Sequence, residues 1–157
     1  MAEKATKPGT FYDRIADAQN VALRINGYRA SVARYLRSID PDLGPGSMVL
    51  DAGSGTGIVT LGLYSAGFDP KRTVTFDLSG KSLKVGLDQF RNDKKARKGR
   101  ISAVQGNILE LPFADDSFDL VLSCGVLEYV PLEDGLSELA RMLKPGGKLV
   151  FIPVKPS

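Results

Sequence analysis

Hydrophobic residues in the first forty-five positions recur at steps of three and four, the period of one face of an α-helix. One series ends before Asn26-Gly27 and a second begins after it, so the pattern predicts two amphipathic helices with a break between them. Pro41 and the Gly- and Pro-rich segment 43–47 end this helical region. The first series is Phe11, Ile15, Ala18, Ala22 and Ile25, and the second is Tyr28, Val32, Tyr35, Leu36 and Ile39.

From Met48 onward, short apolar runs alternate with helical stretches, which indicates βαβ units and a parallel sheet. Right-handed crossovers then favour a doubly wound α/β fold, whose ligands bind at the carboxyl ends of the strands. We expect Lys144-Pro145-Gly146-Gly147 to end the last helix and turn the chain into the fifth strand. The expected strands are 48–50, 74–76, 101–104, 118–122 and 148–152, and the expected helices between them are 58–66, 81–90 and 132–143.

Composition narrows the possible chemistry. The 157 residues contain no His, no Trp and one Cys, which excludes disulfides within the chain, Cys/His zinc sites and His-dependent nucleophile triads. The net charge is +3, but segment 91–100 alone carries six positive charges and one negative. We interpret this segment as a solvated loop and do not expect nucleic acid as a partner. Without a signal-peptide pattern or a long apolar stretch, we expect a cytoplasmic protein with no transmembrane segment.

The first strand leads into Asp51-Ala52-Gly53-Ser54-Gly55-Thr56-Gly57 and then a helix. Glycines permit a tight turn and a close approach of the backbone to a ligand. The spacing fits neither Gly-x-Gly-x-x-Gly nor a P-loop, since the residue after Gly57 is Ile58 and no Lys follows. An acid within the turn would repel a diphosphate and suit a positively charged ligand.

Asp77 ends the second strand, where its carboxylate could accept hydrogen bonds from the two hydroxyls of a ribose. It lies twenty residues after Gly57, a distance that NAD-binding domains share. The acid alone therefore does not distinguish a nicotinamide-dependent reductase from other nucleoside-binding proteins. A second interpretation of Asp77 is that it caps the following helix.

Together these motifs resemble the class I S-adenosylmethionine-dependent methyltransferases, especially the small-molecule branch of the ubiquinone and menaquinone pathways. The resemblance implies a Rossmann-like sheet in the order 3-2-1-4-5, without strands 6 and 7. It also implies an N-terminal helical cap over the cofactor site at 1–45, and a cofactor-binding core at 46–157. The motifs, in the order of the family, are 49–57, Asp77, 106–113 with 117–119, and 143–147.

The resemblance implies a role for several residues at the cofactor, S-adenosyl-L-methionine, whose product is S-adenosyl-L-homocysteine. Asp51 and the turn Gly53-Ser54-Gly55 would surround the methionine part, Asp77 would hold the ribose, and Leu78 would lie against the adenine. Asn107, in place of the usual Asp, and Ile108 would bind the adenine edge. Asn107 could instead be an ordinary turn residue. Tyr12 would reach over the cofactor or be an ordinary helix aromatic, and Cys124 would contact the cofactor or only be buried beside it.

On the acceptor side, Tyr129 stands where many relatives have a His, with Glu128 beside it. We expect these two residues to face the methyl acceptor, a small molecule, and we expect no metal. An RNA methyltransferase stays an alternative if segment 91–100 is functional.

The family fold continues beyond a fifth strand, whereas this sequence stops ten residues after Gly147. A truncated sequence, a minimal domain, or an edge completed by self-association of a second copy would each account for this. The same observation leaves a non-catalytic cofactor-binding domain as an alternative function.

Overall fold

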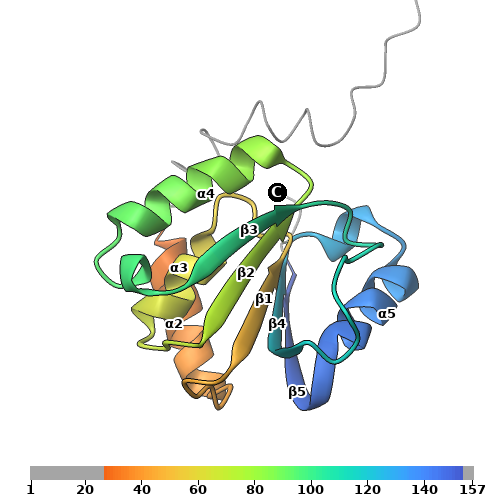
Figure 1. Cartoon of the computed structure of the whole chain (residues 1–157), viewed down its shortest axis with the longest axis horizontal. Helices are drawn as coiled ribbons and strands as arrows, with labels where there is room; N and C mark the ends of the chain where they lie inside the picture. The colour runs from red at the N-terminus through yellow and green to blue at the C-terminus, as the bar shows by residue number, and fades with distance from the viewer. Residues whose placement is uncertain (1–26, 154–157) are drawn as a thin grey trace, which may run out of the picture.

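The computed structural model describes residues 27–153, in which five strands form one parallel sheet (Figure 1). The strand order is β3-β2-β1-β4-β5. Strands β2 and β3 are added on one side of β1, and β4 and β5 on its other side, so the order reverses between β1 and β4. The predicted Rossmann-like fold and its strand order are confirmed. The strands are β1 Met48–Ala52, β2 Arg72–Asp77, β3 Ile101–Gln105, β4 Phe118–Cys124 and β5 Leu143–Ile152.

Helices cover both faces of the sheet (Figure 1). On one face, α2, α3 and α4 pack over an apolar core. On the other face, α5 shares the cover with the irregular segment 106–117 that joins β3 to β4. The helices are α2 Tyr28–Ile39, α3 Ile58–Ser65, α4 Gly80–Asn92 and α5 Leu132–Met142, with short 3₁₀ turns η1 Ala96–Lys98 and η2 Leu127–Tyr129.

The more central of these helices, α3, is apolar almost all round because it lies between the sheet and α2. Seven of its eight residues are buried. Gly62 permits the close approach of α2, since a Cβ there would lie 2.6 Å from Cγ1 of Val32. The second predicted helix is thus part of the helical layer, and the first one, with Phe11 and Ile15, lies outside the described residues.

The start of the fifth strand differs from the prediction. We expected Lys144-Pro145-Gly146-Gly147 to form a turn, but β5 already begins at Leu143, which pairs with Phe118. The ladder is irregular between Phe118 and Leu120, and Gly146 has a φ of +80°. Pro145 is tolerated because β5 is an edge strand, where the Pro nitrogen does not have to donate a hydrogen bond to a neighbouring strand.

Candidate functional site

The glycine turn, residues 53–57, rests on the end of β2. The backbone N–H groups of Gly53 and Ser54 both donate to the carbonyl of Phe76, at 2.7 and 3.0 Å. The N–H of Gly57 donates back to the carbonyl of Ser54 at 2.9 Å. All three glycines have positive φ, +77° at Gly53, +53° at Gly55 and +92° at Gly57, a conformation that side chains disfavour. The backbone geometry therefore requires glycine at alternate positions of the turn.

The glycines differ in what surrounds them. A Cβ at Gly53 would lie 2.6 Å from Cβ of Val126, in the loop after β4, and one at Gly57 would lie 2.4 Å from Cζ of Phe90 in α4. A Cβ at Gly55 would have nothing within 4 Å among the described residues. Two glycines thus serve packing, whereas Gly55 borders open space at the carboxyl edge of the sheet.

Asp51 is fully buried on β1. Its Oδ2 accepts a hydrogen bond from the Thr60 hydroxyl of α3 at 2.6 Å, and its Oδ1 has no partner among the residues that the structure describes. Burial raises the pKa of the Asp51 carboxyl to about 7, and the nearby charge of Asp77 adds to the shift. A buried carboxylate with an unpartnered oxygen is costly unless a donor or a positive charge meets it. The residues present therefore fit the cationic methionine part of the expected cofactor.

Asp77 connects the ends of β1 and β2. Its Oδ2 accepts from the N–H of Gly55 at 2.8 Å, and its Oδ1 accepts from the N–H of Ser79 at 2.9 Å. The alternative that Asp77 caps α4 is wrong, because the N-cap is Ser79, whose hydroxyl accepts from the N–H of Ser82. The carboxylate is thus fixed beside the glycine turn.

The three residues expected at the adenine lie after β2 and β3. Leu78 is 43% exposed, although it is apolar, and it directly follows Asp77. Ile108 is buried in the core under α5. Asn107 is an exposed turn residue, because its Oδ1 accepts from the N–H of Leu109 at 2.9 Å and its carbonyl accepts from Glu110. An amide oxygen has two lone pairs, so this bond leaves the expected contact to an adenine chemically possible.

The residues after β4 form the acceptor-side candidates. Cys124 ends the strand, and its thiol contacts the Tyr28 hydroxyl of α2 at 3.1 Å. Burial raises the pKa of that thiol, which keeps it in the neutral form. Glu128 and Tyr129 lie in η2 and are exposed, Tyr129 to 72%. The structure thus brings these residues to the same edge of the sheet as Asp51 and Asp77.

Two features of this edge were missed by sequence reasoning. Thr60, which orients Asp51, is one of several hydroxyl residues in an otherwise apolar helix. The hydroxyls of Ser54 and Ser123 are buried without a partner in the described part of the chain, as is Oδ1 of Asp51. Ser123 pairs in register with Ala52, beside the point where the strand order reverses. Ser54 belongs to the glycine motif, whereas only the burial of Thr60 and Ser123 reveals these two residues.

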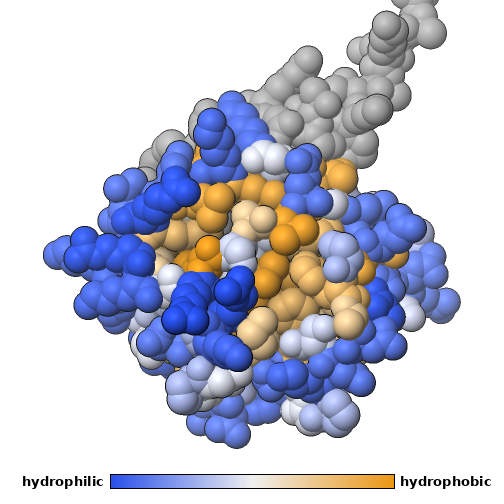
Figure 2. Space-filling model, viewed as in Figure 1, coloured by the Kyte–Doolittle hydropathy of each residue, from blue (hydrophilic) through white to orange (hydrophobic). Residues whose placement is uncertain are grey.

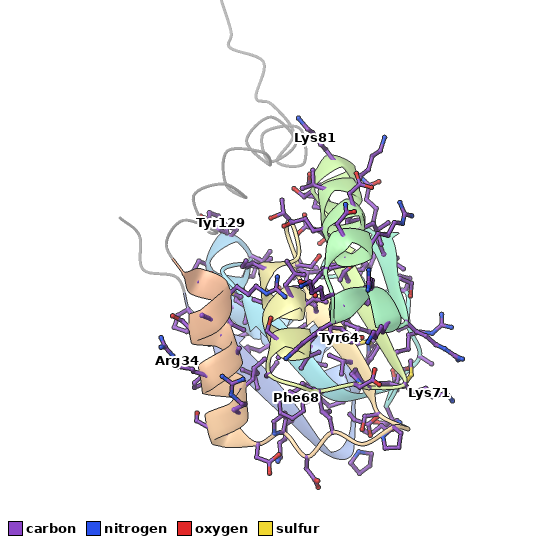
Figure 3. All side chains as sticks on the ribbon, turned by 90° about the vertical axis from the view of Figure 1, so that its left-hand side faces the viewer. Arg34, Tyr64, Phe68, Lys71, Lys81 and Tyr129 are labelled. Carbon is purple, nitrogen blue, oxygen red and sulfur yellow. The ribbon has the colours of Figure 1, made fainter. Side chains whose placement is uncertain are left out.

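The basic segment lies at the other end of the sheet. It joins the end of α4 to the start of β3, whereas the glycine turn follows the carboxyl end of β1. Figure 3 shows this separation, with Lys81 and Tyr129 toward one end of the molecule and Phe68 and Lys71 toward the other. A cavity of about 280 Å³ lies there between Phe68 and the lysines Lys94 and Lys98.

Segment 91–100 is also more ordered than a solvated loop. The carboxylate of Asp93 accepts from the backbone of Lys95 and Ala96 and pairs with Arg29 of α2. Ala96 is buried in the core, and a Cβ at Gly99 would lie 2.5 Å from the ring of Tyr64. The interpretation of segment 91–100 as a solvated loop therefore applies only to its exposed Lys and Arg side chains.

Among residues 27–153, no group of three or more His, Cys, Asp or Glu side chains is placed to hold a metal ion. None of the helices in that range has the length and apolar character needed to cross a membrane. Tyr12 lies outside the described residues.

A glycine turn follows β1, Asp51 is buried on β1, and a second acid, Asp77, ends β2. This pattern agrees with a comparison to known families. Residues 50–151 match the model of a family described as a methyltransferase domain. The chain belongs to this methyltransferase family. The match covers the sheet from β1 to β5, which includes every candidate residue except Tyr12 and begins one residue before Asp51. The resemblance expected from the motifs is therefore confirmed.

Among curated proteins, a ubiquinone/menaquinone biosynthesis C-methyltransferase UbiE of Rhizobium leguminosarum bv. trifolii is 31% identical over 137 residues. The alignment covers 87% of this chain and 52% of that protein. This methyltransferase chain thus spans about half the length of the curated relative.

Solved structures agree on the fold of this methyltransferase. A Methanococcus maripaludis protein described as an S-adenosyl-L-methionine-dependent methyltransferase superposes with a TM-score of 0.75 at 22% identity. That match covers 98% of this chain and 67% of the other. Geranyl diphosphate C-methyltransferase of Streptomyces coelicolor A3(2), solved with S-adenosyl-L-homocysteine, is 26% identical, with a TM-score of 0.65 over 79% of this chain and 43% of the other.

Proposed function

We propose that this chain binds S-adenosyl-L-methionine at the carboxyl edge of its sheet and transfers the methyl group to a small molecule. One observation carries the proposal: within residues 27–153, the buried Asp51 carboxylate has an oxygen without a partner, beside a glycine turn that opens at Gly55. A cationic ligand would satisfy that oxygen, whereas the phosphates of a dinucleotide would be repelled by it. Family membership and the Streptomyces structure with S-adenosyl-L-homocysteine support the same ligand.

In this proposal a group of the protein contacts each part of the ligand. Asp51 and the backbone of Gly53 and Gly55 hold the methionine part, and Asp77 binds the ribose hydroxyls. Leu78 lies against one face of the adenine, and Asn107 with Ile108 binds its edge. The bound cofactor supplies a methyl group on a positively charged sulfur. The protein's task is to align the acceptor with that methyl and to exclude water.

We assign Glu128 and Tyr129 to the acceptor side, since both follow β4 at the same edge. The two relatives named above act, by their names, in quinone biosynthesis and on geranyl diphosphate. These names support an apolar or amphipathic acceptor for this chain as well. Cys124 would contribute an apolar contact to the cofactor, with its thiol held in place by Tyr28.

A second candidate function is cofactor binding without turnover. The exposed edge of β5, with Phe151 39% exposed, offers a place for a second copy to pair.

We also assign the protein to the cytoplasm, where its thiol, Cys124, would stay reduced. An RNA acceptor is not favoured, because the basic segment lies at the opposite end of the sheet.

Calorimetric titration of the purified chain with S-adenosyl-L-homocysteine and with NADH tests the proposal. We expect binding of the adenosyl ligand and none of NADH. Binding of NADH alone, or of neither, would overturn the proposed function. Incubation with methyl-labelled S-adenosyl-L-methionine and a cell extract then separates turnover from binding alone, and size-exclusion chromatography of the same sample tests for pairing of two copies.

A further inference from the structure

Segment 106–117 crosses one face of the sheet without helix or strand, and α5 holds it in place. Two side chains of α5 do this, Glu138 and Arg141, one helical turn apart. They form a two-pronged ion pair, with Arg141 Nε 2.8 Å from Glu138 Oε1 and Nη2 3.0 Å from Oε2. The side chains of Glu138 and Arg141 are 21% and 32% exposed, so the pair is partly shielded from water.

The same two side chains bind the backbone of the segment. Arg141 donates to the carbonyls of Leu111 and Phe113, each at 2.9 Å, and Glu138 accepts from the N–H of Leu111 at 2.9 Å. Both backbone polar groups of Leu111 are therefore fixed by α5. Because hydrogen bonds are directional, these bonds set the rotation of the chain at Leu111 as well as its position.

Leu111 directly follows the turn expected at the adenine. That turn closes on itself, since Asn107 accepts from Leu109 through its side chain and from Glu110 through its carbonyl. A closed turn moves as a unit, so the direction in which it presents the Asn107 oxygen and the Ile108 N–H follows from the orientation of Leu111. Arg141 and Glu138 thus control that direction although they do not touch the turn.

Apolar contacts cannot replace this control. The ring of Phe113 packs edge-on against those of Phe76 and Phe118, with centroids 6.1 and 5.3 Å apart, and Leu111 is buried beneath. Such contacts hold the segment against the sheet, but they are non-directional and do not orient its N–H and C=O groups. A segment without its clamp would stay packed and lose a defined edge toward the ligand.

We propose that Glu138 and Arg141 are positioning residues for adenine recognition, acting through Leu111 on the turn Asn107–Glu110. This inference rests on the proposed function. The sequence assigns them no such role, because Glu138 has the appearance of one more exposed helix charge.

The test compares the binding of S-adenosyl-L-homocysteine with that of its deaminated analogue, S-inosyl-L-homocysteine. Deamination turns the adenine amino donor into an acceptor and its N1 acceptor into a donor, so both expected contacts to the turn are reversed. Two lost hydrogen bonds should give the unaltered chain a preference of roughly 30-fold for the adenosyl ligand. A purely structural role of the clamp would lower both affinities and leave this ratio unchanged.

Arg141→Ala and Glu138→Gln should each reduce the preference to about 3-fold or less, because the turn is no longer oriented. Arg141→Lys, which keeps the charge without the two-pronged geometry, should give an intermediate ratio. Asp115→Asn is the matched control: it removes the charge of a fourth partner of Arg141 that is 72% exposed, and the ratio should stay at the unaltered value. Circular dichroism identifies the folded variants, and Glu138→Gln serves if Arg141→Ala does not fold.

An unchanged ratio in the folded clamp variants would overturn the inference while leaving the proposed function in place. A reduced ratio in Asp115→Asn equal to that in Arg141→Lys would overturn it as well, since surface charge would then suffice. Failure of the unaltered chain to bind either ligand would overturn the proposed function and this inference with it.

Discussion

The glycine turn 53–57 lies at the carboxyl edge of the sheet, where the segment 106–117 also begins, but the two are held by different means. The turn is fixed from within, by positive φ angles and by backbone bonds to Phe76 and to the Asp77 carboxylate. The segment has backbone bonds near its two ends, at Gly106 and Glu110 and at Asp116 and Ser117. Its middle, at Leu111 and Phe113, is fixed from outside by side chains of α5. The two sides of one proposed site thus depend on different kinds of interaction.

The difference decides how each part should respond to substitution. A turn that depends on backbone conformation has few tolerated residues, and a single methyl group is enough to disturb it. A segment held by a side-chain network can lose one partner and remain folded, because its apolar residues are still buried. Damage to the turn should therefore appear in stability, and damage to the segment in ligand selectivity.

The largest effect is expected from adding a methyl group within the turn. In Gly53→Ala, the positive φ costs about 1–2 kcal/mol and the clash with Val126 adds to it, so the melting temperature should fall by several degrees. Gly55→Ala has a similar φ but no clash, and should melt closer to the unaltered chain. Its new methyl would occupy the proposed cofactor space. Relative to the fall in melting temperature, calorimetry should therefore show a larger loss of S-adenosyl-L-homocysteine affinity in Gly55→Ala than in Gly53→Ala.

The pair of variants separates packing from ligand contact. Equal melting temperatures for Gly53→Ala and Gly55→Ala would show that Val126 yields without cost. An undiminished affinity of Gly55→Ala for S-adenosyl-L-homocysteine would show that the ligand does not bind against the turn.

A smaller effect is expected at Asp77. Replacement by Ala removes a charge-assisted pair of bonds to the ribose and should weaken S-adenosyl-L-homocysteine binding by about 1.5–3 kcal/mol. It also removes the acceptor for Gly55, so stability should fall modestly. Asp88→Asn, an exposed acid on α4, is the control and should leave calorimetric affinity unchanged. Equal affinities for Asp77→Ala and the control would remove Asp77 from the ribose site.

The smallest effect on ligand affinity is the pH dependence set by Asp51. Its pKa is raised from 3.8 to about 7 by burial, so between these values the folded protein holds a proton that the unfolded chain releases. The free energy of unfolding due to this group should therefore fall as the pH rises from about 4 to 7, and level off above. A cationic ligand favours the carboxylate, so affinity should rise through pH 6–7 and level off above it.

Calorimetry from pH 5.5 to 8 with Asp51→Asn as the control checks this sign. The amide cannot ionise, so the variant should show weaker affinity at pH 8 and a flatter profile. A parallel rise in both proteins would attribute the pH dependence to another group.

Sequence reasoning predicted what local patterns encode. The alternation of apolar runs and helical periods was sufficient for a doubly wound parallel sheet, whereas its strand order followed from the resemblance to the methyltransferases. The spacing of glycines and acids was sufficient to bring Asp51 and Asp77 to one edge. The start of β5 was missed because Pro145 and Gly146 are ordinary turn residues everywhere except at a sheet edge.

The clamp on segment 106–117 was missed for a different reason. Glu138 and Arg141 read as an exposed i,i+3 pair on a helix, and their bonds reach residues 27 to 30 positions away along the chain. No spacing rule relates an α-helix to an irregular segment at that separation. The core between them is equally non-local. Figure 2 shows an apolar area in the middle of the view, surrounded by hydrophilic residues.

The separation of the basic segment from the acids has an electrical consequence. Six cations near the start of β3 and the carboxylates of Asp51 and Asp77 at the strands' far ends put charges of opposite sign at the two ends of the sheet. A ligand with a positively charged sulfur is drawn toward one pole and turned away from the other. Its association should therefore slow as added salt weakens this long-range steering.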